Sequence, residues 1–207
     1  MIDAPQGSEA WLQERCGHVT ASEFSSVLAK GTEKKMRTAY LRRVVTERLT
    51  GKPSATYATG YWLKNLERGK EQEPYARMAY EAITGNVVEE VGFIKHPTLM
   101  AGCSPDGLIS IDGGAEIKSV IPTVQLETIL AGGYPPQHKP QIQGSLWLLG
   151  RTWWDFESHS PDMPEHLRNY IFRVVRDEPY IAALAIEVKT FLAEVDLMVT
   201  KLMERKL

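Results

Sequence analysis

The chain has 207 residues, of which 43% are hydrophobic, and its formal net charge is −2. This is enough for one folded domain over residues 1–207, with helical elements at its N- and C-terminal ends, and the small net charge counts against a broad surface that coats DNA. Its two cysteines, Cys16 and Cys103, fit no metal-binding or disulfide pattern, and no basic segment with an apolar run opens the chain. We therefore expect a protein of the reducing cytoplasm, without a signal peptide.

The predicted elements form a helical first part, a strand-rich middle and a helical end. Thr20 and Glu23 have the spacing of a capping box, which predicts a helix that carries Phe24, Val27 and Leu28 on one side. The remaining elements, in chain order, are helices at 33–49 and 62–83, strands at 87–94, 108–111 and 115–120, helices at 122–131 and 139–149, strands at 152–158 and 170–175, and a helix at 179–205. Gly69 and Pro74 predict a kink or a break in the second of these helices. Helices around a short mixed sheet indicate an α/β fold.

The segment around Asp106 and Glu116 carries the chemical signal. Apolar residues at 108–111 and 115–120 read as two strands, and the turn residues Asp112-Gly113-Gly114 fold them into a hairpin. Side chains alternate along a strand, so Glu116 and Lys118 share one face while Ile117 points away. An aspartate at the neighbouring strand, Asp106, can then meet them.

This arrangement suits a metal-dependent hydrolase. Carboxylates and a backbone carbonyl are hard ligands for Mg²⁺ or Mn²⁺, and a lysine beside the metal can orient or deprotonate a water. Pro105-Asp106 and Glu116-Ile117-Lys118 have the form of the PD-(D/E)xK nuclease signature. The triplet alone favours a solvated hairpin with an exposed Glu–Lys pair, whereas the upstream Ser104-Pro105-Asp106-Gly107-Leu108, together with the flanking apolar strands, favours the nuclease.

Five motifs in order resemble the phage lambda-type exonucleases, also called the YqaJ-like viral recombinase or alkaline exonuclease group. The resemblance covers the chain from Trp11 to about Tyr180 and implies a restriction-endonuclease-like core with a central mixed β-sheet flanked by helices. The motifs are Arg15-Cys16-Gly17-His18-Val19-Thr20-Ala21-Ser22, Gly69-Lys70-Glu71-Gln72-Glu73, Gly102-Cys103-Ser104-Pro105-Asp106-Gly107-Leu108, Glu116-Ile117-Lys118 and Gln141-Ile142-Gln143-Gly144-Ser145-Leu146-Trp147.

The resemblance assigns a role to individual residues. It places the metal ligands at Asp106, Glu116, the carbonyl of Ile117 and Glu73, with Glu71 as a competitor for the last position. It places the catalytic lysine at Lys118. It places Gln141 near both the attacking water and the terminal 5′ phosphate. It places three further residues at the phosphate: Arg15, Ser22 and Ser104. Without the resemblance, Gln141 and Gln143 read as ordinary polar helix residues.

The function implied is a Mg²⁺-dependent 5′→3′ exonuclease that acts on double-stranded DNA, releases mononucleotides and leaves a 3′ overhang for phage recombination by strand annealing. Mn²⁺ is expected to substitute for Mg²⁺, with two ions per site. The resemblance further implies a homotrimeric ring, a phage single-strand annealing protein as partner, and the cytoplasm of a bacterial host. Two alternatives stay open: a nuclease of another polarity or of endonucleolytic habit, and a catalytically idle phage DNA-binding protein.

Overall fold

The computed structural model describes residues 4–54 and 61–205, and for residues 61–68 and 70 it describes the backbone alone. The helices are α1 (Glu9–Arg15), α2 (Phe24–Leu28), α3 (Lys34–Thr50), α4 (Tyr61–Thr84), α5 (Pro122–Ala131), α6 (Lys139–Leu149) and α7 (Glu178–Met203), with short 3₁₀ turns at 21–23, 31–33, 136–138 and 165–167. The strands are β1 (Val19–Thr20), β2 (Val88–Glu89), β3 (Ile94–Lys95), β4 (Ala101–Cys103), β5 (Gly107–Ile109), β6 (Gly113–Ser119), β7 (Trp153–His159) and β8 (Asn169–Val175).

A five-stranded mixed sheet, in the order β2-β5-β6-β7-β8, is the centre of the fold. β6 and β7 are parallel, and the other neighbours are antiparallel. Ala76 and Tyr80 of α4 pack on one face against Ala115 and Ile117. On the other face α6 packs against the β7 side chains Trp154 and Phe156. The predicted α/β class, and the hairpin formed by β5 and β6, are therefore confirmed.

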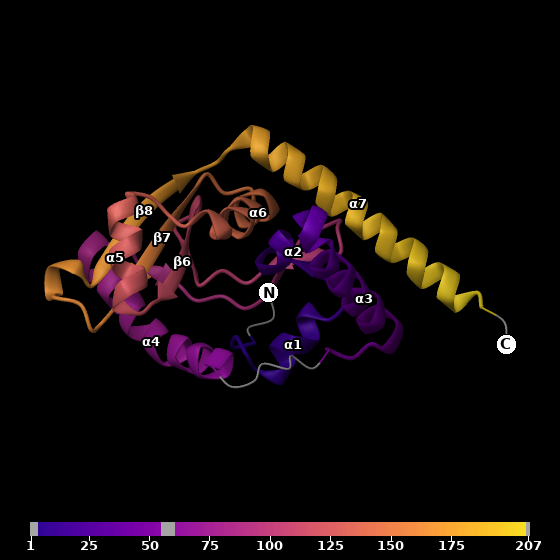
Figure 1. Ribbon diagram of the computed structural model, residues 1–207, viewed down its shortest axis with the longest axis horizontal. Helices are drawn as coiled ribbons and strands as arrows, with labels where there is room; N and C mark the ends of the chain where they lie inside the picture. The colour runs from indigo at the N-terminus through magenta and orange to yellow at the C-terminus, as the bar shows by residue number, and fades with distance from the viewer. Residues whose placement is uncertain (1–3, 55–60, 206–207) are drawn as a thin grey trace.

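A second layer is helical and lies beside the sheet. Figure 1 shows α4 and α5 at the sheet, and α2, α3 and α7 together on the opposite side of the molecule. Phe191 of α7 is fully buried and stacks on Tyr40 of α3, with ring centroids 5.3 Å apart. The buried face of α7 is the one that the 3.6-residue spacing predicts: Ile181, Leu184, Val188, Phe191, Leu192 and Val195. In the described part of the chain, no helix has the length and apolar character needed to cross a membrane.

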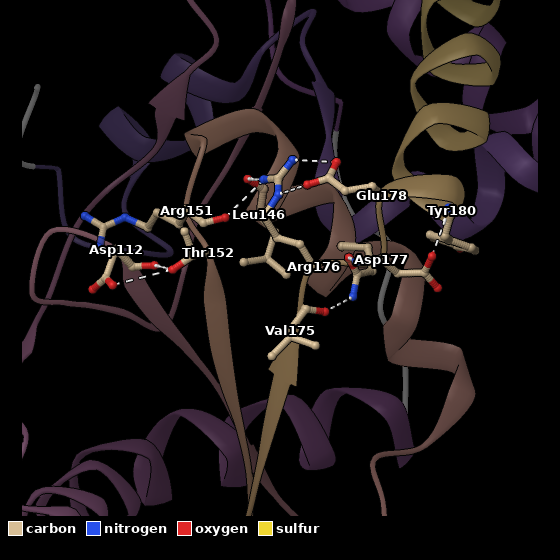
Figure 2. Close-up of polar contacts among 10 residues, drawn as sticks. Asp112, Leu146, Arg151, Thr152, Val175, Arg176, Asp177, Glu178 and Tyr180 are labelled. Carbon is tan, nitrogen blue, oxygen red and sulfur yellow. Dashed lines mark hydrogen bonds and ion pairs between the residues drawn. The ribbon is translucent and has the colours of Figure 1, made fainter.

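A polar network at the corner between β8 and α7 holds α6 in place (Figure 2). The guanidinium of Arg176 donates to the carbonyl of Leu146 at 2.7 Å and pairs with Glu178 at 2.6 Å. The amide of Gln143 donates to the carbonyl of Val175 and accepts from the N–H of Asp177, each at 2.9 Å. Gln143 is buried, so its bonds satisfy backbone groups that would otherwise be unpaired. Its role is structural.

Gly144 of α6 is required by close packing. A Cβ at this position would lie 2.4 Å from Cδ2 of Phe24, which is fully buried. The absence of a side chain therefore lets α2 approach α6.

The predicted capping box is not formed. The side chain of Thr20 makes no capping hydrogen bond, and its backbone N–H donates to the hydroxyl of Tyr40 at 2.9 Å. Glu23 instead accepts from Ser26 at 2.9 Å and pairs with Arg43 at 2.6 Å. The Glu23 carboxylate, which the local pattern assigned to the helix N-terminus, therefore forms a salt bridge with Arg43.

Two other element predictions differ from the structure. The strand predicted at 87–94 is two short strands in different sheets, since β2 pairs with β5 and β3 pairs with β4. The helix predicted at 62–83 is one continuous helix, with Pro74 inside it. Gly85, in the left-handed conformation at φ 71°, follows its end.

Candidate active site

Two carboxylates and a lysine from the β5–β6 hairpin meet beside the sheet. Glu116 and Lys118 lie two residues apart on β6, and Asp106 directly precedes β5. Nζ of Lys118 contacts Oε1 of Glu116 and lies 4.0 Å from Oδ2 of Asp106. Oδ2 of Asp106 also accepts a hydrogen bond of 2.6 Å from the backbone N–H of Ile117. Since the N–H and C=O of one strand residue point to the same side, the Ile117 carbonyl lies on the Asp106 side of β6.

Gln141 joins this group from a different element. It lies in the first turn of α6, and its Nε2 is 2.7 Å from both carboxylate oxygens of Glu116. Glu116 is only 1% exposed, so Gln141 and Lys118 supply the hydrogen bonds that its buried charge requires.

The structure separates the two candidate acids of α4. Glu73 is half-buried, and its pKa rises to about 7, first because of burial and then because of the Asp106 carboxylate. The charge of Lys118 acts on it in the opposite direction. Glu71 is exposed. Glu73 is therefore the α4 acid that senses the other charged groups of the site.

The charges of this group are not balanced. Burial, and then the carboxylate of Glu116, raise the pKa of Asp106. Burial alone would lower the pKa of Lys118, but Glu116 and Asp106 outweigh it and raise that pKa, which keeps the ammonium protonated. One ammonium therefore faces three carboxyl groups, and the excess negative charge favours either protons or a metal cation.

The residues present fit a divalent metal in their chemistry. Asp106, Glu116 and Glu73 offer hard oxygen donors with more negative charge than Lys118 neutralises. Within the residues that the structure describes, no three His, Cys, Asp or Glu side chains already form a metal ligand set. Lys118 and Gln141 occupy the oxygens of Glu116 here, so those oxygens must exchange partners before they can bind a cation.

The predicted phosphate ligands form a second group. Nη1 of Arg15 donates to Oγ of Ser104 at 3.0 Å, and Nη2 donates to Oγ of Ser22 at 3.3 Å. These residues come from α1, the segment after β4 and the 3₁₀ turn at 21–23, so the tertiary fold assembles them. No carboxylate in the described part of the chain forms a salt bridge with Arg15. Glu23 acts on the Arg15 guanidinium only from beyond salt-bridge distance, so this cation and the two hydroxyls beside it suit an anion.

Trp11 was not assigned a role from sequence. Its Nε1 donates to Oγ of Ser104 at 3.0 Å, and the guanidinium of Arg15 lies 4.1 Å from the centroid of its ring. Both residues line a cavity of about 230 Å³ that reaches Tyr40 and Arg43. The spacing of four between Trp11 and Arg15 on α1 is the signal that was available, because residues i and i+4 are neighbours on a helix.

His138 is a second unassigned neighbour. All five histidines lack metal-ligand spacing, which gave no reason to single it out. Its ring stacks on Phe156, with centroids 5.5 Å apart. Burial, and then the charge of Lys118, lower its pKa to about 4. His138 is therefore a neutral group beside the cluster.

This fold and its charged hairpin place the protein in a class of nucleases. The chain aligns over 95% of its length with 96% of an alkaline exonuclease (LHK-Exo) from Laribacter hongkongensis, at 36% identity and a TM-score of 0.84. The same enzyme in complex with dAMP gives a TM-score of 0.85 at 36% identity, with 94% and 96% of the two chains covered. A phage-related exonuclease from Haemophilus somnus shares the fold at a TM-score of 0.65 and 14% identity, with 89% of this chain and 96% of that chain covered. No curated protein gave a sequence match.

The family follows from the sequence match. Residues 10–152 match the model of the YqaJ-like viral recombinase domain. The chain belongs to the YqaJ-like viral recombinase family, as its five motifs indicated.

Proposed function

We propose that this protein is a Mg²⁺-dependent 5′→3′ exonuclease that degrades one strand of duplex DNA to mononucleotides and leaves a 3′ overhang. The observation that carries the proposal is the junction of the two side-chain groups. Ser104 accepts a hydrogen bond from Arg15, and Asp106 faces Lys118. Ser104 and Asp106 are two positions apart, so at most about 7 Å of extended chain separates them. A candidate phosphate-binding group thus adjoins a group suited to phosphodiester hydrolysis. The complex of LHK-Exo with dAMP shows a nucleoside monophosphate bound to a related protein.

The metal ligands would be Asp106, Glu116, Glu73 and the carbonyl of Ile117. Mg²⁺ bound there, with Mn²⁺ able to substitute and two ions per site, would acidify water and neutralise charge on the phosphate. Lys118 would stabilise negative charge on the non-bridging oxygens, because its contacts with Glu116 and Asp106 hold it protonated. Gln141 would orient Glu116 and the attacking water, which its contact with both Glu116 oxygens supports.

A linear duplex labelled at one end tests the reaction. We expect Mg²⁺-dependent release of a 5′ label as mononucleotide at the earliest times, and loss of a 3′ label on the same strand only late. Early release of the 3′ label would indicate the opposite polarity, and cleavage of closed circular DNA an endonuclease. Absence of cleavage with either metal would indicate a DNA-binding protein without catalysis.

Recognition of the 5′ end gives a sharper prediction. Duplexes with a 5′ phosphate should be digested about tenfold to hundredfold faster than duplexes with a 5′ hydroxyl, since hydrogen bonds to a charged group contribute about 1.5–3 kcal/mol. Arg15→Ala should remove most of this preference while changing the rate on 5′-hydroxyl ends much less, because the lost contact exists only with the phosphate. Initial rates on the two substrates measure it.

Two further variants make the Arg15 experiment specific. Arg37 is paired with Glu194 at 2.7 Å, and its hydrogen bonds go to Glu194 and not to Arg15, Ser22 or Ser104. Arg37→Ala should therefore keep the full preference. Trp11→Phe retains an aromatic ring beside Arg15 but removes the N–H that binds Ser104, so it should reduce the preference partially. Equal rates on both kinds of end in the unchanged enzyme would contradict the pocket.

We propose the assembly and the partner from the resemblance to the phage lambda-type exonucleases. A homotrimeric ring that encloses DNA would hold its substrate without a strongly basic surface. Three of the four arginines of α3 support such a device, because Arg37, Arg43 and Arg48 are paired with Glu194, Glu23 and Asp196. The partner would be a phage single-strand annealing protein that loads on the 3′ overhang, and the location the cytoplasm of a bacterial host. The mass in solution, compared with the 23.3 kDa chain, tests the ring.

A further inference from the structure

A third set of polar side chains, distinct from the two described above, lies at the C-terminal ends of β6 and β7: Ser119, Glu157 and His159. Glu157 and His159 are two residues apart on β7 and therefore share one face, and His159 is directly opposite Ser119 of β6. Glu157 is 0% exposed and His159 is 6% exposed. Both carboxylate oxygens of Glu157, Nε2 of His159 and Oγ of Ser119 are buried and have no hydrogen-bond partner among the residues that the structure describes.

One hydrogen bond, at Nδ1, determines which nitrogen of the His159 ring carries the proton. Nδ1 lies 2.7 Å from Oδ1 of Asn169, the residue opposite it on β8. Because an amide oxygen only accepts, the proton is assigned to Nδ1, and Nε2 then carries a free lone pair. Histidine metal ligands usually donate their other ring N–H to a carboxylate, a backbone carbonyl or a water, and the amide oxygen of Asn169 is an acceptor of the same kind.

The fold satisfies a comparable buried carboxylate nearby. Asp155 lies on the same face of β7 and is 2% exposed. It accepts from the hydroxyl of Tyr80 at 2.6 Å and pairs with Arg173 at 2.8 and 2.9 Å. Glu157 has no such donor in the described ranges 4–54 and 61–205, although an unpaired buried carboxylate is costly by several kcal/mol. One proton can join only two of these atoms, and burial does raise the pKa of the Glu157 carboxyl to about 8, whereas a cation can bind Glu157, His159 and Ser119 together.

We propose that Glu157, His159 and Ser119 form a binding site for a transition-metal dication of the Zn²⁺ class, separate from the site at Asp106 and Glu116. An imidazole nitrogen with carboxylate and hydroxyl oxygens is a borderline ligand set that favours Zn²⁺ over Mg²⁺, and water completes the coordination. The all-oxygen set at Asp106 and Glu116 has the opposite preference. Bound there, the cation ties the end of β6 to β7, one residue beyond Lys118.

The test uses the full chain with two carboxylates of the first proposed metal site, Asp106 and Glu116, replaced by their amides. In the double variant Asp106→Asn/Glu116→Gln, dialysed against chelator and titrated calorimetrically with Zn²⁺, we expect one equivalent to bind per chain. Co²⁺ in its place should give a visible absorption band typical of low-coordinate nitrogen and oxygen ligation. Adding Glu157→Gln or His159→Gln should weaken binding by more than about 100-fold, since loss of a mere outer partner already costs 10- to 100-fold.

Asn169→Ala provides the matched positioning variant. It leaves both ligands in place, removes only the acceptor of Nδ1–H, and should weaken Zn²⁺ binding by about 10- to 100-fold. Circular dichroism and thermal melting report whether each variant folds, and the two independent ligand substitutions keep the test decisive if one does not. The proposal is overturned if the double variant binds no Zn²⁺, or if neither ligand substitution weakens binding. Glu157→Gln melting higher than its parent with no response to Zn²⁺ would show that a proton occupies the site.

Discussion

Asp106→Asn and Glu116→Gln are each expected to abolish phosphodiester cleavage in a protein that still folds. Each change removes a charged oxygen donor from the proposed Mg²⁺ site while keeping the size of the side chain. DNA binding should survive better than cleavage, because one negative charge fewer faces the phosphate backbone. Cleavage of a 5′-phosphorylated duplex and binding of the same duplex without metal measure the two effects.

The pair of acids on α4 supplies a matched comparison. Glu73 feels the charges of Asp106 and Lys118, so Glu73→Gln should lower cleavage and raise the Mg²⁺ concentration needed for it. Glu71 is exposed and two residues away, and Glu71→Gln should leave both quantities unchanged. Full turnover with Mg²⁺ in the Asp106 or Glu116 variant would show that the metal site lies elsewhere.

Lys118→Ala is expected to reduce the cleavage rate by about 10²–10³-fold, the usual cost of losing one preorganised charge stabiliser. The ammonium lies between Glu116 and Asp106 before substrate binds. Binding of metal and DNA should persist, because Lys118 is not a metal ligand in the proposed arrangement. Single-turnover rates at saturating DNA separate this effect from binding.

The control is a lysine outside the site. Lys189 is exposed on α7, and Lys189→Ala should leave the single-turnover rate unchanged. Loss of Mg²⁺ binding in Lys118→Ala, measured by calorimetry, would make the lysine a structural element of the site and contradict its assigned role.

Much of the charged hairpin could be predicted from sequence because it depends on local rules. The period of two along a strand puts Glu116 and Lys118 on one face, and turn residues predicted the hairpin of β5 with β6. The turn itself lies at 110–112, because the predicted turn residues Gly113 and Gly114 already pair with β5. The same local reasoning failed at Thr20 and Glu23. A capping box and a salt bridge compete for one carboxylate, and the winner depends on Arg43, which only the packing of α3 brings near.

The choice between Glu71 and Glu73 also required the tertiary structure. Both lie on one helix, and which of them reaches the hairpin depends on how α4 is rotated against β6. Trp11 is a similar case, since its bond to Ser104 joins residues 93 positions apart in the chain.

By itself, the sequence determined the α/β class, most of the helices and strands, the charged hairpin and the family. Periodicity and turn chemistry depend on residues close together in the chain, and the order of the motifs is a property of the sequence itself. Only the tertiary structure decided which polar groups share a site. It joined Arg15, Ser22 and Ser104, and it brought Gln141 to Glu116. It also buried the Glu157 carboxylate and Nε2 of His159 with no hydrogen-bond partner among the described residues. The physical reason is that burial and hydrogen bonding depend on contacts between distant segments, which no local pattern encodes.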